Sequence, residues 1–183
     1  MLKIFRKLFT VAFSLLVISA LYTEESLPTG FKNIHFGMSV DEVKEELKKD
    51  ASFGFRGDRD VSLLPGENRI LIETDTSRTA PHSILERCWF QFYEDKLYTI
   101  TLNLRRSKID HYSVFSSLTE KYGNPSSLNP EKSEWKDDNV IMSLERPLTL
   151  KYTDRKIFEE LQSKALVNKS AEEMARDEFL EGL

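Results

Sequence analysis

The sequence predicts an α+β fold in which an antiparallel sheet packs against helices and a C-terminal helical tail follows. Two segments place apolar residues at helical spacing, and each begins with a capping residue, Ser39 or Asp110. Each segment precedes stretches in which apolar and polar residues alternate, which is typical of strands with one buried face. Short polar turns join those stretches and favour antiparallel pairing. The order of helix, three strands, helix, three strands and helix suggests an αβββ unit used twice.

Composition limits the classes of function. The chain has 183 residues, of which 40% are hydrophobic and 31% charged, an ordinary balance for one globular domain. Its net charge of −4 argues against a general nucleic-acid-binding protein. The single cysteine, Cys88, excludes an intrachain disulfide and a metal site made of cysteines alone. We expect a signal peptide at 1–20, an α+β domain at 28–153 and a helical segment at 154–183.

The N-terminus has the pattern of a secretory signal peptide. Three basic residues within the first seven precede an apolar run at 8–22, which is shorter than the roughly 20 residues that span a bilayer. Cleavage near Ala20 removes those charges and changes the net charge from −4 to −7. We therefore expect an exported protein, periplasmic or secreted, with no integral membrane span. The alternative is an uncleaved signal anchor that tethers the protein to the membrane.

The first helix is expected at Val40–Lys49. Ser39 is its N-cap, and Glu42 completes a capping box three residues later. Val43 and Leu47 lie on the apolar face of this helix. Strands are expected before and after the helix, at 31–36 and 68–73, with loops at 54–66 and 74–82.

The next segment predicts a hairpin with strands at 86–93 and 97–105. A three-residue loop, 94–96, opposes Phe92 to Tyr98, Phe90 to Ile100 and Cys88 to Leu102, which collects the apolar residues on one face. A two-residue loop would mix the faces and expose Phe92 or Tyr98, so we expect the longer loop.

The second half is expected to repeat the pattern. Asp110 caps a helix that ends before Gly123, where a left-handed residue is favoured. Three strands follow at 134–136, 140–145 and 148–153. Trp89 and Trp135 each lie in a strand before a charged turn, a weak similarity between the halves. The charged, helix-favouring sequence from Asp154 onward predicts one or two C-terminal helices.

Residues 31–47 read FKNIHFGMSVDEVKEEL. This strand, Gly-Met-Ser turn and capped helix resemble the opening of small exported bacterial domains, namely the SmpA/BamE-like outer-membrane-assembly lipoproteins and the two-repeat β-lactamase-inhibitor-protein fold. The resemblance covers about a third of the chain. The chain lacks the lipid-bearing cysteine of the first family and the paired cysteines of the second. The resemblance implies a small helix-on-sheet domain that works by binding protein, and it carries over no functional residue.

The common catalytic motifs are absent from the sequence. It contains no H-E-x-x-H, G-x-S-x-G, P-loop or C-x-x-C motif. The spacing of His35, His82 and His111 predicts no metal site. Cys88 belongs to the apolar row of the hairpin, which predicts a buried core residue rather than a nucleophile. We therefore expect a protein that is not an enzyme and that has no catalytic residue, metal or cofactor.

The loop with Asp58 and Asp60 allows two interpretations. Its carboxylates have the chemistry of calcium ligands, but the segment lacks the third carboxylate and the glycine of an EF-hand loop. Arg56 and Arg59 offer ion-pair partners instead, so a solvated structural loop is the favoured interpretation.

The polar face of the predicted hairpin is the candidate site. It combines aromatic and arginine side chains with adaptable polar groups, a composition typical of the centres of protein interfaces. Two alternatives remain open: the C-terminal helix or a loop covers these aromatic residues, or they line a groove for a small ligand. The candidate partner-binding residues are Trp89, Tyr93, Gln91, Thr99, Thr101, Arg87 and Arg105.

These observations predict a non-enzymatic exported protein that binds another envelope protein or assists envelope assembly through this face. The alternative is a protein that binds a small apolar or lipid-like ligand between the sheet and the helices. That alternative predicts a cavity lined by Phe90, Phe115 and Leu118. A hydrolase whose site is assembled from distant residues is a third hypothesis, and no motif in the sequence supports it.

Overall fold

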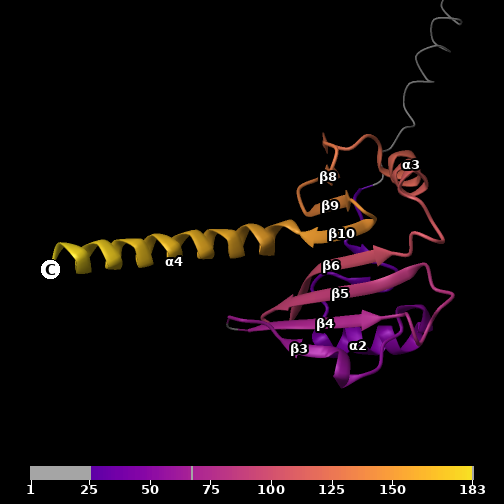
Figure 1. Ribbon diagram of the computed structural model, residues 1–183, viewed down its shortest axis with the longest axis horizontal. Helices are drawn as coiled ribbons and strands as arrows, with labels where there is room; N and C mark the ends of the chain where they lie inside the picture. The colour runs from indigo at the N-terminus through magenta and orange to yellow at the C-terminus, as the bar shows by residue number, and fades with distance from the viewer. Residues whose placement is uncertain (1–25, 67, 183) are drawn as a thin grey trace, which may run out of the picture.

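The structure is a computed structural model that describes residues 26–66 and 68–182, and it confirms the predicted α+β class (Figure 1). An eight-stranded antiparallel sheet has the strand order β3-β4-β5-β6-β10-β9-β8-β7. A hairpin of β1 (Gly30–Phe31) and β2 (Ile34–His35) lies where one short strand was predicted. The sheet strands are β3 (Val61–Leu63), β4 (Arg69–Asp75), β5 (Leu85–Tyr93), β6 (Lys96–Leu104), β7 (Ser127–Leu128), β8 (Lys132–Lys136), β9 (Val140–Glu145) and β10 (Thr149–Asp154).

The chain repeats a unit of one helix and four strands. Helix α2 (Val40–Lys49) precedes β3–β6, and helix α3 (His111–Tyr122) precedes β7–β10. The predicted αβββ unit is therefore one strand short, because β3 and β7 were missed. These edge strands have only three and two residues, too few to show an alternating pattern. The last strands of the two units, β6 and β10, pair with each other and form the centre of the sheet.

Local capping determines where both of these helices begin. Ser39 accepts a hydrogen bond from the backbone N–H of Glu42, whose side chain accepts one from the backbone of Ser39, so the predicted capping box is confirmed. Asp110 caps α3 by accepting from the N–H of Ser113 at 2.9 Å. Gly123, just after α3, has a φ of 75°, a left-handed value that favours glycine. The predicted bounds of α2 agree with the structure.

The β5–β6 hairpin uses a two-residue turn, so the predicted three-residue loop is wrong. Glu94 and Asp95 both have positive φ, and Tyr93 pairs with Lys96. This turn suits the twist of paired strands. A bulge at Tyr98 then restores the predicted register, so that Phe90 opposes Ile100 and Cys88 opposes Leu102. Phe92 opposes Leu97 instead of Tyr98, and both Phe92 and Leu97 remain buried.

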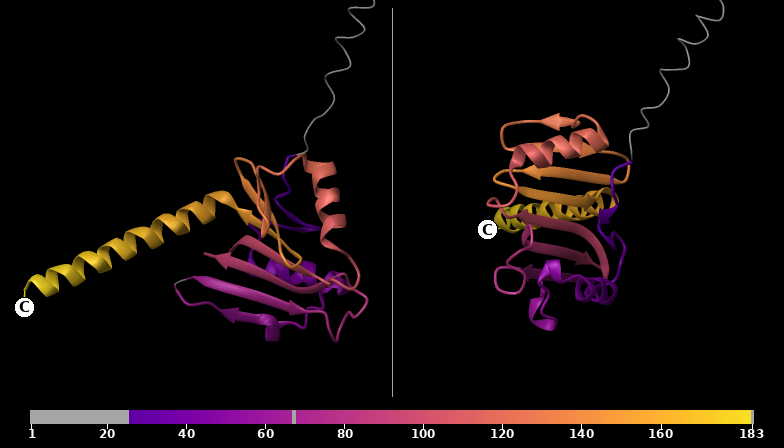
Figure 2. Two further views of the ribbon diagram at one scale, coloured as in Figure 1. Left: turned by 45° about the horizontal axis from the view of Figure 1, so that its top comes forward. Right: turned by 90° about the vertical axis from the view of Figure 1, so that its right-hand side faces the viewer.

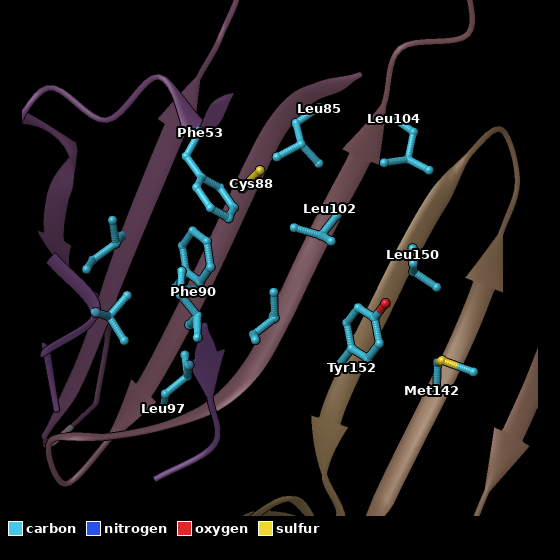
Figure 3. Close-up of a cluster of buried hydrophobic side chains, with 14 of the residues drawn as sticks. Phe53, Leu85, Cys88, Phe90, Leu97, Leu102, Leu104, Met142, Leu150 and Tyr152 are labelled. Carbon is cyan, nitrogen blue, oxygen red and sulfur yellow. The ribbon is translucent and has the colours of Figure 1, made fainter. Parts of the chain in front are cut away.

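The hydrophobic core lies on one face of the sheet, which we call the inner face. Figure 3 shows the inner side chains of neighbouring strands, with Phe53 against Phe90 at a ring-centroid distance of 5.9 Å. Cys88 is fully buried among them, as predicted. Helices α2 and α3 both cover this side, and α4 (Arg155–Glu181) leads away from the other side (Figure 2). We call that opposite side of the sheet the outer face.

The C-terminal segment is one continuous helix of 27 residues. Asp154 caps α4 by accepting from the N–H of Ile157 at 3.1 Å. Leu161 is its last buried residue, and all later described side chains of the helix are exposed. Within the described residues, none of the helices combines the length and the apolarity needed to cross a bilayer. The predicted signal peptide at 1–20 lies outside the described residues.

The two tryptophans do not occupy equivalent places in the two units. Trp135 lies in β8, the second strand of its unit, and is buried on the inner face. Trp89 lies in β5, the third strand of its unit, and is only half-buried on the outer face. The weak similarity predicted from the two tryptophans is therefore not a structural correspondence.

Candidate functional site

Strand pairing builds a continuous polar row across the outer face. Trp89 opposes Glu73 on one neighbouring strand and Thr101 on the other. Across the β6–β10 pair, Thr101 opposes Lys151, which in turn opposes Ser143 of β9. Inner and outer side chains alternate along each strand, so the buried row Cys88–Phe90–Phe92 fixes Trp89 outward. The central outer row therefore holds one aromatic ring, hydroxyl groups and both signs of charge.

The structure places six of the seven predicted site residues on this outer face. Arg87, Trp89, Gln91 and Tyr93 alternate with buried residues along β5. Thr99 and Thr101 of β6 oppose Gln91 and Trp89, respectively. The six residues therefore form two adjacent lines of side chains.

Arg105 lies elsewhere and is a correction to the predicted site. Strand β6 ends at Leu104, so Arg105 no longer follows the alternation of the strand. Its guanidinium donates to Thr76 Oγ1 at 2.8 Å and to the carbonyl oxygen of Ser83 at 3.2 Å. Arg105 therefore fixes the loop between β4 and β5.

Arg87 is half-exposed and its charge is balanced. Its guanidinium nitrogens lie 3.7 Å from a carboxylate oxygen of Glu73 and 3.7 Å from one of Asp75. Solvent-exposed pairs of this kind add little stability. Arg87 is therefore available to exchange these partners for a carboxylate on another molecule.

Tyr93 contacts the first turns of α4. Lys164 Nζ donates to the Tyr93 hydroxyl at 2.9 Å and lies 5.2 Å from the centre of its ring. Lys164 also pairs with Glu160 at 2.6 Å, and these two acceptors raise the pKa of the Lys164 ammonium. The C-terminal helix therefore covers Tyr93, in agreement with one of the two alternatives to a partner-binding face.

Tyr98 is an outer-face residue, whereas the sequence predicted it on the apolar face opposite Phe92. It occupies the bulge in β6, and its hydroxyl donates to Gln91 Oε1 at 3.1 Å. Burial raises the pKa of the Tyr98 hydroxyl. Thr99, next in sequence, is only 2% exposed. Gln91 and Thr99 are thus held in place beside the more open Trp89 and Thr101.

Lys151 is a second outer-face residue that was not predicted there. Lys151 lies beside Thr101 because β10 pairs with β6, and no local sequence pattern predicts that pairing. Among the described residues, no carboxylate oxygen lies within ion-pair distance of Lys151 Nζ, whereas Arg87 on the same face has two such neighbours. Lys151 thus gives the centre of the outer face an uncompensated positive charge, one strand beyond Thr101.

The carboxylates of the 54–66 loop form ion pairs within the protein. Asp60 is buried and accepts three hydrogen bonds from Arg56, one from its backbone N–H and two from its guanidinium. Asp58 pairs with Lys44 at 3.2 Å. No group of three or more potential metal-ligating side chains lies together within the described part of the chain. These ion pairs agree with the structural interpretation of the loop, but Asp60 is buried where a solvated side chain was predicted.

The residues predicted to line a ligand cavity, Phe90, Phe115 and Leu118, are part of the packed hydrophobic core or pack against it. Phe90 packs with Phe53 under the first unit, whereas Phe115 of α3 lies 6.0 Å from Trp135 in the second. Phe90 and Phe115 thus have different aromatic neighbours, although Phe115 packs against the same continuous hydrophobic core to which Phe90 belongs. An open groove of about 510 Å³ lies instead between the N-terminal segment, the end of α3 and β10, with Phe31, Tyr122 and Tyr152 in its lining.

Comparison with protein families finds a match over most of the chain. The family model described as the TP0088 domain matches residues 29–164, about three-quarters of the chain. This range includes the whole sheet and extends into α4 as far as Lys164, the residue that contacts Tyr93. No curated protein and no solved structure matches the sequence significantly.

Proposed function

The chain belongs to the TP0088 domain family, and we propose that it is a non-enzymatic exported protein that binds another envelope protein, or assists envelope assembly, through the outer face of its sheet. The observation that carries this proposal is the half-buried Trp89 at the centre of a sheet face opposite to both packing helices. Tryptophan, tyrosine and arginine are the side chains most often found at the energetic centres of protein interfaces.

The surroundings of Trp89 indicate the chemistry of the partner. Thr101 separates the indole from Lys151, whose ammonium has no carboxylate neighbour among the described residues. A partner that places an apolar side chain over Trp89 and a carboxylate beside Lys151 would satisfy both groups. Gln91 is fixed by Tyr98, so this part of the surface is preorganised for binding, which lowers the entropic cost of association.

Export is supported by the sequence. The basic N-terminal residues and the short apolar run after them have the pattern of a secretory signal peptide, which supports a mature protein in the periplasm or outside the cell. The burial of the single cysteine, Cys88, suits an oxidising compartment, because a buried thiol is protected from disulfide exchange.

Site-specific photo-crosslinking in cells tests the proposal. A photo-reactive amino acid at Thr101 is expected to capture the partner, whereas the same group at Tyr112 is not. Tyr112 is a matched control because it is exposed and lies on α3, on the other side of the sheet. Capture of the same proteins from both positions, or of none from Thr101, would contradict the proposal.

Binding to the purified partner then measures the contribution of Trp89. We expect Trp89→Ala to weaken binding at least about tenfold, since truncation at an interface centre typically costs about 2 kcal/mol or more. Tyr112→Ala should leave the affinity unchanged. Far-UV circular dichroism confirms that both variants are folded.

The groove beside β10 supports a second candidate function, the binding of a small apolar or lipid-like ligand. Its volume of about 510 Å³ is within the usual range for ligand pockets, and three aromatic rings line it. Under this alternative, a fluorescent fatty-acid probe binds the purified protein and Tyr122→Ala weakens that binding, while Trp89→Ala does not. Under the protein-binding proposal, Trp89→Ala weakens binding of the crosslinked partner and Tyr122→Ala does not.

A further inference from the structure

The part of α4 beyond the sheet has a face that nothing in the described chain covers. Figure 1 shows this helix leading away from the body of the protein. We call residues 165–181 the distal α4. Its large apolar side chains are Leu166, Val167, Met174, Phe179 and Leu180, which are 66%, 67%, 73%, 68% and 51% exposed.

Four of these five side chains share one side of the helix. At about 100° per residue, Leu166, Val167, Met174 and Leu180 fall within a sector of about 140°. Leu161 and Lys164, which face the body, lie roughly on the opposite side of the helix. One face of α4 thus contacts the sheet of its own chain, and a second, apolar face is exposed on the opposite side of the helix.

The charges of α4 are divided between its two ends. Between 162 and 171 the only charged residues are Lys164 and Lys169. Between 172 and 181 there are five acidic residues and one basic residue, Arg176. Acidic groups near the C-terminal end of a helix oppose its dipole, and the last turn holds no basic residue. The distal α4 would therefore be stabilised by a neighbour that brings positive charge alongside it.

We propose that the distal α4 pairs antiparallel with the α4 of a second copy of this chain. Antiparallel pairing places Lys169 of each helix beside the acidic half of the other, whereas parallel pairing superimposes the two acidic halves. The two helix dipoles are then antiparallel, so the positive end of each helix lies beside the negative end of the other, which is favourable. Such a pair is a closed two-fold dimer, in which the same surface serves both copies.

The apolar residues fit this arrangement. Leu166 and Leu180, which lie at the two ends of the shared apolar side, are equally distant in sequence from residue 173, and Met174 lies beside that midpoint. A two-fold axis near residue 173 therefore brings Leu166 of one copy next to Leu180 of the other, whereas Phe179 lies on the body-facing side of the helix and takes no part in this contact. The inference is independent of the proposed function, since it uses only α4.

Sedimentation of the purified full chain over a range of concentrations tests the dimer. We expect Leu166→Asp combined with Leu180→Asp to raise the dissociation constant of the dimer at least about tenfold. The control combines Asn168→Asp with Ala175→Asp, which adds two negative charges on the body-facing side of the helix and should leave the constant within about twofold. A wild-type chain that stays monomeric at all concentrations, or an equal effect of both pairs, overturns the proposal.

Cysteine crosslinking tests the orientation, with Cys88 retained because it is buried. In the antiparallel pair Glu173→Cys forms a disulfide with its own copy. Ser163→Cys and Glu181→Cys crosslink only when the two variants are mixed. Self-crosslinking of Ser163→Cys would show a parallel pair and overturn the proposed arrangement.

Discussion

Within the described part of the chain, some residues of the outer face are held in place by other side chains, whereas Trp89 is not. Gln91 is held by the hydroxyl of the bulged Tyr98, and Tyr93 by Lys164 of α4. Trp89 remains half-buried between Glu73 and Thr101. A substitution at Trp89 is therefore the most direct test of binding, because it disturbs none of the contacts that hold its neighbours.

His111 is predicted to make the stability of the protein depend on pH. Burial, and then the nearby Arg146 guanidinium, lower the pKa of His111 below its ordinary value of 6.5. The unfolded chain therefore binds a proton more readily than the folded one. The stability associated with neutral His111 is fully present above about pH 6.5 and is lost as the pH falls through its folded pKa.

Urea unfolding at pH 7.5 and 5.5 checks this prediction. His111→Gln should reduce the loss of unfolding free energy between the two pH values. His82→Gln, a change in an exposed loop residue, serves as the control and should retain the wild-type loss. An unchanged pH dependence in His111→Gln would contradict the assigned role.

At the scale of elements, the turn of the β5–β6 hairpin connects the sheet to α2. Glu94 and Asp95 both adopt left-handed backbone conformations, with φ of 48° and 57°. Asp95 also accepts a hydrogen bond from the backbone N–H of Val40 at 3.0 Å, at the start of α2. In Asp95 the hydrogen bond to the start of α2 therefore offsets the backbone strain. In Glu94, which makes no such contact to α2 within the described residues, the strain is not offset.

Glycine substitutions at the two positions are predicted to have opposite effects. Glu94→Gly removes the left-handed strain and should raise the free energy of unfolding by roughly 0.5–1 kcal/mol. Asp95→Gly removes strain as well, but it leaves the Val40 N–H at the start of α2 without its carboxylate acceptor and should lower the free energy of unfolding by about 1 kcal/mol. Chemical denaturation of the two variants measures both values. Destabilisation by Glu94→Gly would contradict this account.

The elements predicted well are those determined by neighbouring residues in the sequence. Capping at Ser39 and Asp110 and the left-handed Gly123 are local features, and they located α2 and α3. The bulge at Tyr98 was missed because a two-residue turn followed by a bulge gives the same pairing at Phe90–Ile100 as a three-residue loop without one. Lys151 became part of the candidate site only through the pairing of β6 with β10, strands separated by a complete helix and three other strands.

At the scale of the whole molecule, the two units share one sheet and one core. Their contact is the β6–β10 pair, in which Ile100 opposes Tyr152 and Leu102 opposes Leu150 on the inner face. All four of these side chains are buried. Separating the units would expose them to water and break the central strand pairing, so we expect neither unit to remain folded when the other unfolds.

Each unit contains one tryptophan, which makes this expectation measurable. Trp135→Phe leaves Trp89 as a reporter of the first unit, and Trp89→Phe leaves Trp135 as a reporter of the second. Within each variant, the midpoint of unfolding by fluorescence should equal the midpoint by far-UV circular dichroism, because the strands of both units lose their structure together. Comparing the two probes inside one variant removes the effect of the substitution on overall stability. A fluorescence midpoint that differs from the dichroism midpoint in either variant would show that the β6–β10 pair joins two independently folding units.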